Sequence, residues 1–207
     1  MSLDRLPISY ILIAINVVIS LYAFENRELL YDLSFQVGPV LDGQYYRMLT
    51  SGFLHVDFNH LLFNMLTLFF FGPVLEDERT LGKMNFLILY FGSLIGGSAA
   101  ALLLNLNDPY YAAVGASGAI SGVMAAVSLF APFMVILIFG IIPIPAVLYA
   151  IGFIGISAFA MGSGAGGIAH EAHLGGALTG LLLAIMLFPP VLGLFIRQIQ
   201  NKLNRRR

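Results

Sequence analysis

Residues 115–131 read GASGAISGVMAAVSLFA, an apolar segment that is rich in small side chains and contains no charged residue. The sequence continues without a charge as far as Met161, and a transmembrane helix needs about 20 largely apolar residues. The whole chain is similar, since hydrophobic residues make up 59% of its 207 residues and charged residues only 10%. Soluble domains carry about 25% charged residues, so the sequence predicts an all-α integral membrane protein.

Apolar stretches of suitable length recur along the chain. Six predicted spans cover residues 8–24, 56–75, 83–104, 115–131, 145–161 and 170–190. Pro132, Pro143 and Pro145 separate the fourth span from the fifth, because proline removes a backbone donor and clashes with the preceding turn. Residues 132–144 are therefore predicted to be an apolar connector at the membrane face. Hydropathy alone also allows three spans in this region, and only the depths of the polar residues described below favour two.

The distribution of basic residues predicts how the protein is oriented in the membrane. Five of the ten Lys and Arg residues lie in a basic tail, residues 191–207. With six spans, three more fall on the side of the termini, and only Arg27 and Arg47 fall on the other. Positive charge stays cytoplasmic, so we expect both termini in the cytoplasm, residues 25–55 as a long outer loop, and one domain over residues 1–207. The first span has no Ala-x-Ala cleavage site and is expected to be an anchor and not a cleaved signal.

Three polar side chains fall near the outer ends of three predicted spans, namely His60, Ser117 and His173. Ionisable residues inside a membrane are functional candidates because burying them is costly. Serine is a weak nucleophile until a base takes its proton, and imidazole titrates near neutrality. We therefore predict that Ser117 is a nucleophile and His173 its general base.

Small residues flank both predicted catalytic residues. Gly118, Ser121, Gly122 and Ala125 share one face of the fourth span, and Gly176 and Gly180 form a G-x-x-x-G pattern on the sixth. Such faces let transmembrane helices approach closely, although alone they would indicate packing motifs only. Beside Ser117 and His173 they predict the contact of about 3 Å that proton transfer requires.

Two further polar residues lie on the second span. His60 and Asn64 are four residues apart, so they share a helix face, and both can donate hydrogen bonds to a developing oxyanion. An interhelical polar clamp explains the same spacing and stays open. Glu171 lies two residues before His173 and points to another helix face, so we predict a dyad and not a triad.

At these residues the chain resembles the rhomboid intramembrane serine proteases, and the resemblance covers essentially all of it. The family's four motifs correspond to Gly115–Gly118 (G-x-S-G), to the segment that begins at Ala172 (A-H-x-x-G), to His60 and Asn64 (H-x-x-x-N), and to Tyr46-Arg47 (W-R). The resemblance implies a six-transmembrane-helix bundle in which Ser117 is the nucleophile, His173 the base, and His60 and Asn64 the oxyanion hole. It also implies cleavage of transmembrane protein substrates next to small residues.

This chain departs from the family pattern at two positions. Tyr46 replaces the tryptophan, which should affect the packing of the outer loop more than the chemistry. Ser121 stands where several relatives carry an aromatic ring stacked on the catalytic histidine. How His173 is held is therefore open.

Other kinds of function fit the sequence less well. His170 and His173 are three apart, whereas the zinc-protease helix needs histidines four apart, and the chain has no cysteine. We therefore predict no metal and no cofactor, and expect His170 and His55 to be interfacial or loop residues. The nearly balanced charge gives no case for nucleic acid. A transporter would show charges near the centre of its spans, and a non-proteolytic relative would lack Ser117 or His173.

The predicted depth of the site defines the expected partners. A scissile bond must be unwound from its helix before Ser117 and water can reach it. We expect substrates to be single-span proteins with Gly, Pro or Ser near their outer end. The other partner is the lipid bilayer, and the expected location is a prokaryotic plasma membrane.

Overall fold

The computed structural model describes residues 6–138, 141–160 and 169–205, most of which are helical. Four helices are long and apolar enough to cross a membrane: α1 (Ile8–Glu25), α5 (Phe58–Glu76), α6 (Gly82–Leu104) and α9 (His170–Leu187). Two shorter apolar helices are α7 (Ser117–Phe130) and α8 (Ala146–Ala160). The prediction of a mainly helical protein with several membrane-spanning helices is confirmed, and the four long spans do not establish the predicted count of six.

The predicted outer loop has a structure of its own. It consists of α2 (Arg27–Leu33), β1 (Phe35–Gln36), α3 (Val37–Leu41), α4 (Arg47–Thr50) and the 3₁₀ turn η2 (Ser51–Phe53). The buried Arg47 guanidinium donates hydrogen bonds to the carbonyl oxygens of Tyr31 (2.6 Å) and Ser34 (3.0 Å). It also lies 5.6 Å from the ring centroid of Tyr46. This arginine therefore ties α2 to α4.

Two short antiparallel β pairs interrupt the helical fold. β1 pairs with β2 (Ala112–Ala113), and β3 (Val135–Ile138) pairs with β4 (Ile142–Pro145). The description as all-α was wrong at these places, and the predicted connector 132–144 contains most of a β-hairpin. The prolines of this segment argued against a strand, so the sequence pattern did not predict the hairpin. In a two-stranded sheet, however, each strand is an edge strand, where proline is tolerated.

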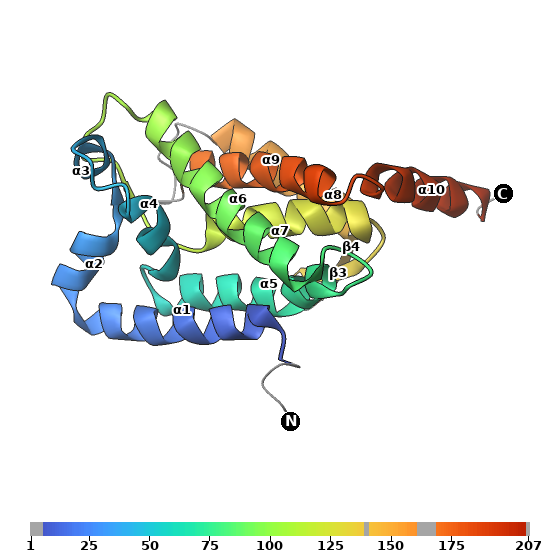
Figure 1. The fold of residues 1–207 in the computed structure, drawn as a ribbon, viewed down its shortest axis with the longest axis horizontal. Coiled ribbons are helices and arrows are strands. Elements are labelled where there is room, and N and C mark those ends of the chain that lie inside the picture. The colour runs from blue at the N-terminus through green and yellow to red at the C-terminus, as the bar shows by residue number, and fades with distance from the viewer. Residues whose placement is uncertain (1–5, 139–140, 161–168, 206–207) are drawn as a thin grey trace.

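Helices α6, α7 and α9 pack closely together (Figure 1). All residues of α7 from Gly118 to Ser128 are buried. A Cβ atom added to Gly176 would lie 2.0 Å from the carbonyl oxygen of Gly118, and one added to Gly180 would lie 2.3 Å from the Cα of Gly122. The backbones of α7 and α9 are therefore in direct contact, as the small-residue faces predicted.

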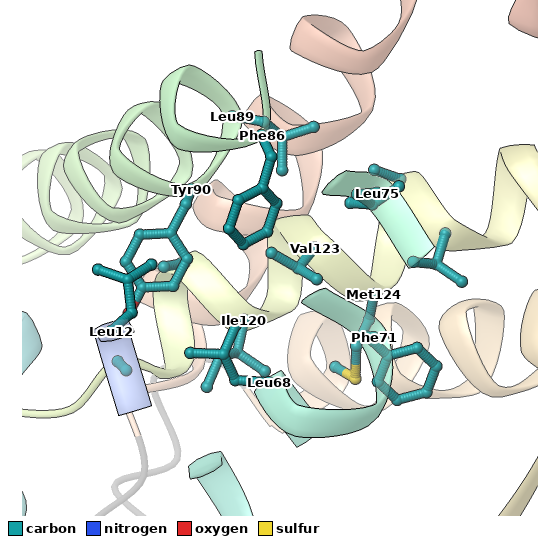
Figure 2. Close-up of a cluster of buried hydrophobic side chains, with 14 of the residues drawn as sticks. Leu12, Leu68, Phe71, Leu75, Phe86, Leu89, Tyr90, Ile120, Val123 and Met124 are labelled. Carbon is teal, nitrogen blue, oxygen red and sulfur yellow. The ribbon is translucent and has the colours of Figure 1, made fainter. Parts of the chain in front are cut away.

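The hydrophobic core lies where α1, α5, α6 and α7 meet. Figure 2 shows its largest side chains, among them Leu12, Phe71, Tyr90 and Met124. At the end of α5, the Glu76 carboxylate accepts hydrogen bonds from the backbone N–H groups of Ile8 (2.5 Å) and Ser9 (2.7 Å). Because the first N–H groups of a helix have no partner within it, this contact ties α1 to α5.

The basic tail contains an amphipathic helix, α10 (Val191–Asn204), which extends beyond the end of the bundle (Figure 1). The Gln198 side chain donates a hydrogen bond to the carbonyl oxygen of Phe130 at 3.0 Å. The tail is therefore attached to the end of α7.

Candidate active site

Ser117 is the first residue of α7, and the turn before it depends on a glycine. Gly115 has φ +126°, in the left-handed region that residues with a Cβ avoid. Its N–H donates a hydrogen bond to the carbonyl oxygen of Ser51 (2.9 Å), and an added Cβ would lie 2.7 Å from Cε1 of His60. The backbone conformation and the close approach of His60 both require glycine here.

His173 lies in the first turn of α9, next to the start of α7. Its Nε2 is 2.8 Å from Oγ of Ser117, within the range for proton transfer between a nucleophile and a base. The two residues are 56 positions apart in the chain. They meet because the glycine faces bring the backbones of α7 and α9 together.

An aromatic ring from another helix holds His173. The ring of Phe153 on α8 stacks on His173, with centroids 5.3 Å apart and an interplanar angle of 29°. Ser121 instead donates to the carbonyl oxygen of Ser117 within its own helix, at 2.6 Å. Sequence reasoning missed Phe153, because no motif connects it to the site and the fifth predicted span contains several aromatic residues.

The two residues predicted on the second span lie beside this pair. Asp57 caps α5 by accepting a hydrogen bond from the N–H of His60 at 2.8 Å. The Asn64 amide donates to the carbonyl oxygen of His60 at 2.9 Å, which leaves a second N–H on the same nitrogen. His60, Asn64, Ser117 and His173 all line one cavity of about 980 Å³, so the four predicted site residues are brought together.

The cavity is lined by residues of α5, α7 and α8. Its apolar lining includes Phe63 of α5, Met124 of α7, and Tyr149 and Phe153 of α8. Toward the outer loop it is lined by Arg27, Tyr31 and Tyr110 among others. The cavity therefore combines apolar side chains with polar groups from α5 and the outer loop.

Two further histidines, His170 and His55, lie near the site. His170 is buried, with its ring 6.1 Å from that of His173 and nearly perpendicular to it, and His55 is completely buried. His55 lies in the loop before α5 and His170 is the first residue of α9, so both occupy the kind of position that was expected, with buried side chains. Tyr111 Oη donates to a carboxylate oxygen of Glu171 at 3.3 Å, and burial raises the pKa of Tyr111.

Neither a carboxylate partner for His173 nor a metal-binding group is found in the described ranges. No carboxylate is hydrogen-bonded to His173 within residues 6–138, 141–160 and 169–205. In those same ranges, no group of three or more His, Asp or Glu side chains is arranged to hold a metal ion. The geometry is that of a serine–histidine pair with a stacked ring, facing a cavity that also has hydrogen-bond donors.

Comparison with known proteins gives consistent matches. The family model described as Rhomboid domain matches residues 42–190. The chain is 46% identical over 83 residues to the putative rhomboid protease YdcA of Bacillus subtilis (strain 168), which is 40% of each protein. It is 32% identical over 163 residues to the rhomboid protease GluP of the same organism, or 77% of this chain and 29% of GluP.

A plant relative extends the comparison. The chain is 28% identical over 169 residues to the mitochondrial RHOMBOID-like protein 12 of Arabidopsis thaliana, or 74% of this chain and 50% of that protein. The chain thus spans half or less of the length of these three relatives.

Proposed function

Because the chain belongs to the rhomboid family, we propose that it is an intramembrane serine endopeptidase that cleaves transmembrane segments of membrane proteins. The observation that carries this proposal is the 2.8 Å contact between Ser117 Oγ and His173 Nε2. The two relatives from Bacillus subtilis are named as rhomboid proteases, which supports the same activity.

The proposed reaction uses Ser117 and His173 in two steps. His173 Nε2 takes the proton of Ser117 Oγ as the oxygen attacks the scissile carbonyl, and it then gives that proton to the leaving amine. Water hydrolyses the resulting acyl-enzyme, with His173 again as base, and restores the free Ser117. The stacked Phe153 ring keeps the imidazole facing Oγ through both steps.

Three donors are available for the oxyanion of the tetrahedral intermediate. They are the His60 ring, the N–H of Asn64 that His60 does not use, and the backbone N–H of Ser117. His60 and Asn64 line the same cavity as the serine, which is the placement that an oxyanion donor needs. We propose that both stabilise charge in the transition state.

The protein is a multi-pass membrane protein, and we propose six crossings with both termini in the cytoplasm of a prokaryote. Helix α7 has 14 residues and is therefore about 21 Å long, whereas the hydrocarbon core is about 30 Å thick. A crossing this short leaves about 9 Å of the core for the segment before it. Ser117, at the start of α7, would then lie below the outer surface.

The cavity supports a proposal about substrates. A chain segment reaches Ser117 only in an extended form, because a helix keeps its backbone carbonyls hydrogen-bonded internally. We propose single-span substrates that carry Gly, Pro or Ser near their outer end. The experiment is incubation of the purified protein in detergent with a model single-span substrate. Equal cleavage by wild type and Ser117→Ala would refute the proposal.

The stacked ring gives a first prediction. Phe153→Leu should lower kcat about three- to tenfold, since a stacked aromatic pair contributes about 0.5–1.5 kcal/mol, while Phe153→Tyr should stay near wild type. The matched control is Phe159→Leu, a change in the same helix at a ring that is 94% exposed. Steady-state cleavage rates would measure this, and equal effects of Phe153→Leu and Phe159→Leu would contradict the role of the stacked ring.

The oxyanion role gives a second prediction. His60→Ala should lower kcat by about a hundredfold with little change in KM, because the donor acts on charge that develops in the transition state. Asn64→Ala should act in the same way, and each loss should be smaller than that of Ser117→Ala. A packing clamp would instead lower the melting temperature. Variants that melt much earlier but keep wild-type kcat would show that these residues are structural.

A third prediction concerns metal ions. Activity should be unchanged within twofold when EDTA is added, because neither the nucleophile nor the base of the proposed reaction needs an ion. The check is the cleavage rate before and after chelation, followed by addition of Zn²⁺. Activity that is lost with EDTA and restored by zinc would favour a role for His170 and His173 as ligands.

A further inference from the structure

His55 is a buried histidine that the proposed reaction does not use. It lies in the loop before α5 and is completely buried. Its Nδ1 is 2.8 Å from Oγ of Ser20, a buried residue of α1, and the same Oγ is 3.1 Å from the carbonyl oxygen of Phe53. These contacts link α1 to the loop that leads into α5.

The hydrogen bonds of Ser20 determine the protonation of His55. A hydroxyl has one hydrogen to donate, and a carbonyl oxygen can only accept. Both contacts are satisfied when Ser20 donates to Phe53 and accepts a hydrogen bond from His55 Nδ1–H. Burial, together with the neighbouring His60, lowers the pKa of His55 to about 3. His55 is therefore a neutral imidazole with its hydrogen on Nδ1.

The ring of His55 lies against the ring of His60. The two centroids are 4.9 Å apart and the interplanar angle is 69°. Nδ1 of His60 is buried and has no hydrogen-bond partner among the described residues. A catalytic or ligating histidine is usually oriented by a hydrogen bond to its second nitrogen, so the contacts of the ring must orient His60 instead.

Those contacts come from two sides. One is His55, and the other is Gly115, where an added Cβ would lie 2.8 Å from His60 Nε2. A buried N–H without an acceptor is costly, which disfavours a hydrogen on Nδ1 of His60. The hydrogen is therefore on Nε2, the nitrogen next to the turn that carries Ser117.

We propose that Ser20 and His55 are positioning residues for His60. Ser20 fixes the ring of His55 through its hydrogen bond, and the ring of His55 holds His60 with its Nε2–H facing the Gly115–Ser117 turn. This inference rests on the proposed function, because it gives His60 its use as an oxyanion donor. Ser20 lies outside the matched residues 42–190, so α1 contributes to the site from beyond the family match.

Substitutions at His55 distinguish the effect of its ring on kcat from the effect of its hydrogen bond to Ser20. His55→Asn keeps an N–H that can reach Ser20 but removes the ring, so kcat should fall about tenfold with KM unchanged within twofold. His55→Phe keeps a ring and leaves no unpaired donor, since the Ser20 hydroxyl still donates to Phe53. It should lose less kcat than His55→Asn, and equal losses would overturn a role for the ring contact.

A double-mutant cycle tests whether His55 acts through His60. In a His60→Ala background, His55→Asn should lower kcat by less than twofold, because the group that it positions is gone. A tenfold fall in both backgrounds would overturn the proposal and assign His55 a general structural role. Melting temperatures identify any variant that does not fold. If His55→Asn does not fold, Ser20→Ala, which removes the hydrogen bond that fixes the ring of His55, takes its place in the cycle.

Nitrogen NMR tests the pair without any measurement of activity. The chain has four histidines, so protein labelled with ¹⁵N-histidine gives four sets of ring signals, and the set lost in His55→Asn belongs to His55. We expect a hydrogen on Nδ1 of His55 and on Nε2 of His60 in the wild type. Ser20→Ala should shift the ring signals of both residues.

The matched control is Ser9→Ala, which removes the other fully buried hydroxyl of α1, one without a hydrogen-bond partner among the described residues. It should leave all four sets of signals unchanged. Unchanged His60 signals in Ser20→Ala would overturn the proposal even if the wild type is an active protease. Shifted His60 signals in a protein that cleaves no substrate would refute the proposed function and leave the positioning pair standing.

Discussion

We expect Ser117→Ala to abolish cleavage of a single-span substrate, with a fall in kcat of at least about a thousandfold. The reason is that Ser117 Oγ, the proposed nucleophile, lies 2.8 Å from Nε2 of His173, the proposed base. His173→Ala should have an effect of similar size, and the double variant should be no worse than either single one, because the two residues act as a unit. Both variants should keep the melting temperature of the wild type within a few degrees.

The matched control is Ser121→Ala, one turn further along α7. The hydroxyl of Ser121 donates to the carbonyl oxygen of Ser117 and takes no part in the proposed reaction, so this variant should keep activity within about threefold. A fluorophosphonate should label the wild type and Ser121→Ala but not Ser117→Ala. Residual activity within tenfold of wild type in Ser117→Ala, or labelling of that variant, would refute the assignment of Ser117 as nucleophile.

Gly180→Ala should strongly destabilise the fold. The added Cβ would lie 2.3 Å from Cα and 2.6 Å from the carbonyl oxygen of Gly122, and backbone atoms cannot rotate away as a side chain can. Helices α7 and α9 would have to separate, at a cost of about 3 kcal/mol, the upper end of what overpacking usually costs. Because the same interface aligns Ser117 with His173, whatever folded protein remains should also cleave more slowly.

The control for this change is Gly152→Ala on α8, where an added Cβ would meet nothing within 4 Å. Alanine is the better helix former by about 1 kcal/mol, so this variant should be as stable as the wild type or slightly more stable. Melting temperatures in one detergent would compare the two variants. If Gly180→Ala melts with the wild type, the direct backbone contact between α7 and α9 is wrong.

Much of the fold and the grouping of the candidate site could be predicted from the sequence. Membrane helices depend on the apolar character of a local stretch, so α1, α5, α6 and α9 begin and end within a few residues of the predicted limits. The small residues beside Ser117 and His173 indicated that their helices would touch. The chemical roles of Ser117, His173, His60 and Asn64 stay predictions.

Other features depend on contacts that no local pattern encodes. The hairpin β3–β4 contains prolines that argued against a strand, and its pairing was not visible in hydropathy. Phe153 is one aromatic residue in an apolar span, and only the packing of α8 against α9 places its ring on His173. The outer loop could be expected to have structure, but not that Arg47 would be buried among its carbonyl groups.

For this protein, the sequence by itself indicated that the helices lie in a lipid bilayer, where they begin and end, and which residues carry the proposed chemistry. Hydropathy, proline positions and short motifs are properties of neighbouring residues, which can be read in order along the chain. Only the tertiary structure decided how His173 and His60 are held, through Phe153 and through Ser20 with His55. Phe153 is 20 residues from His173, and Ser20 is 35 residues from His55. These residues become neighbours only when the helices pack together, which no local pattern encodes.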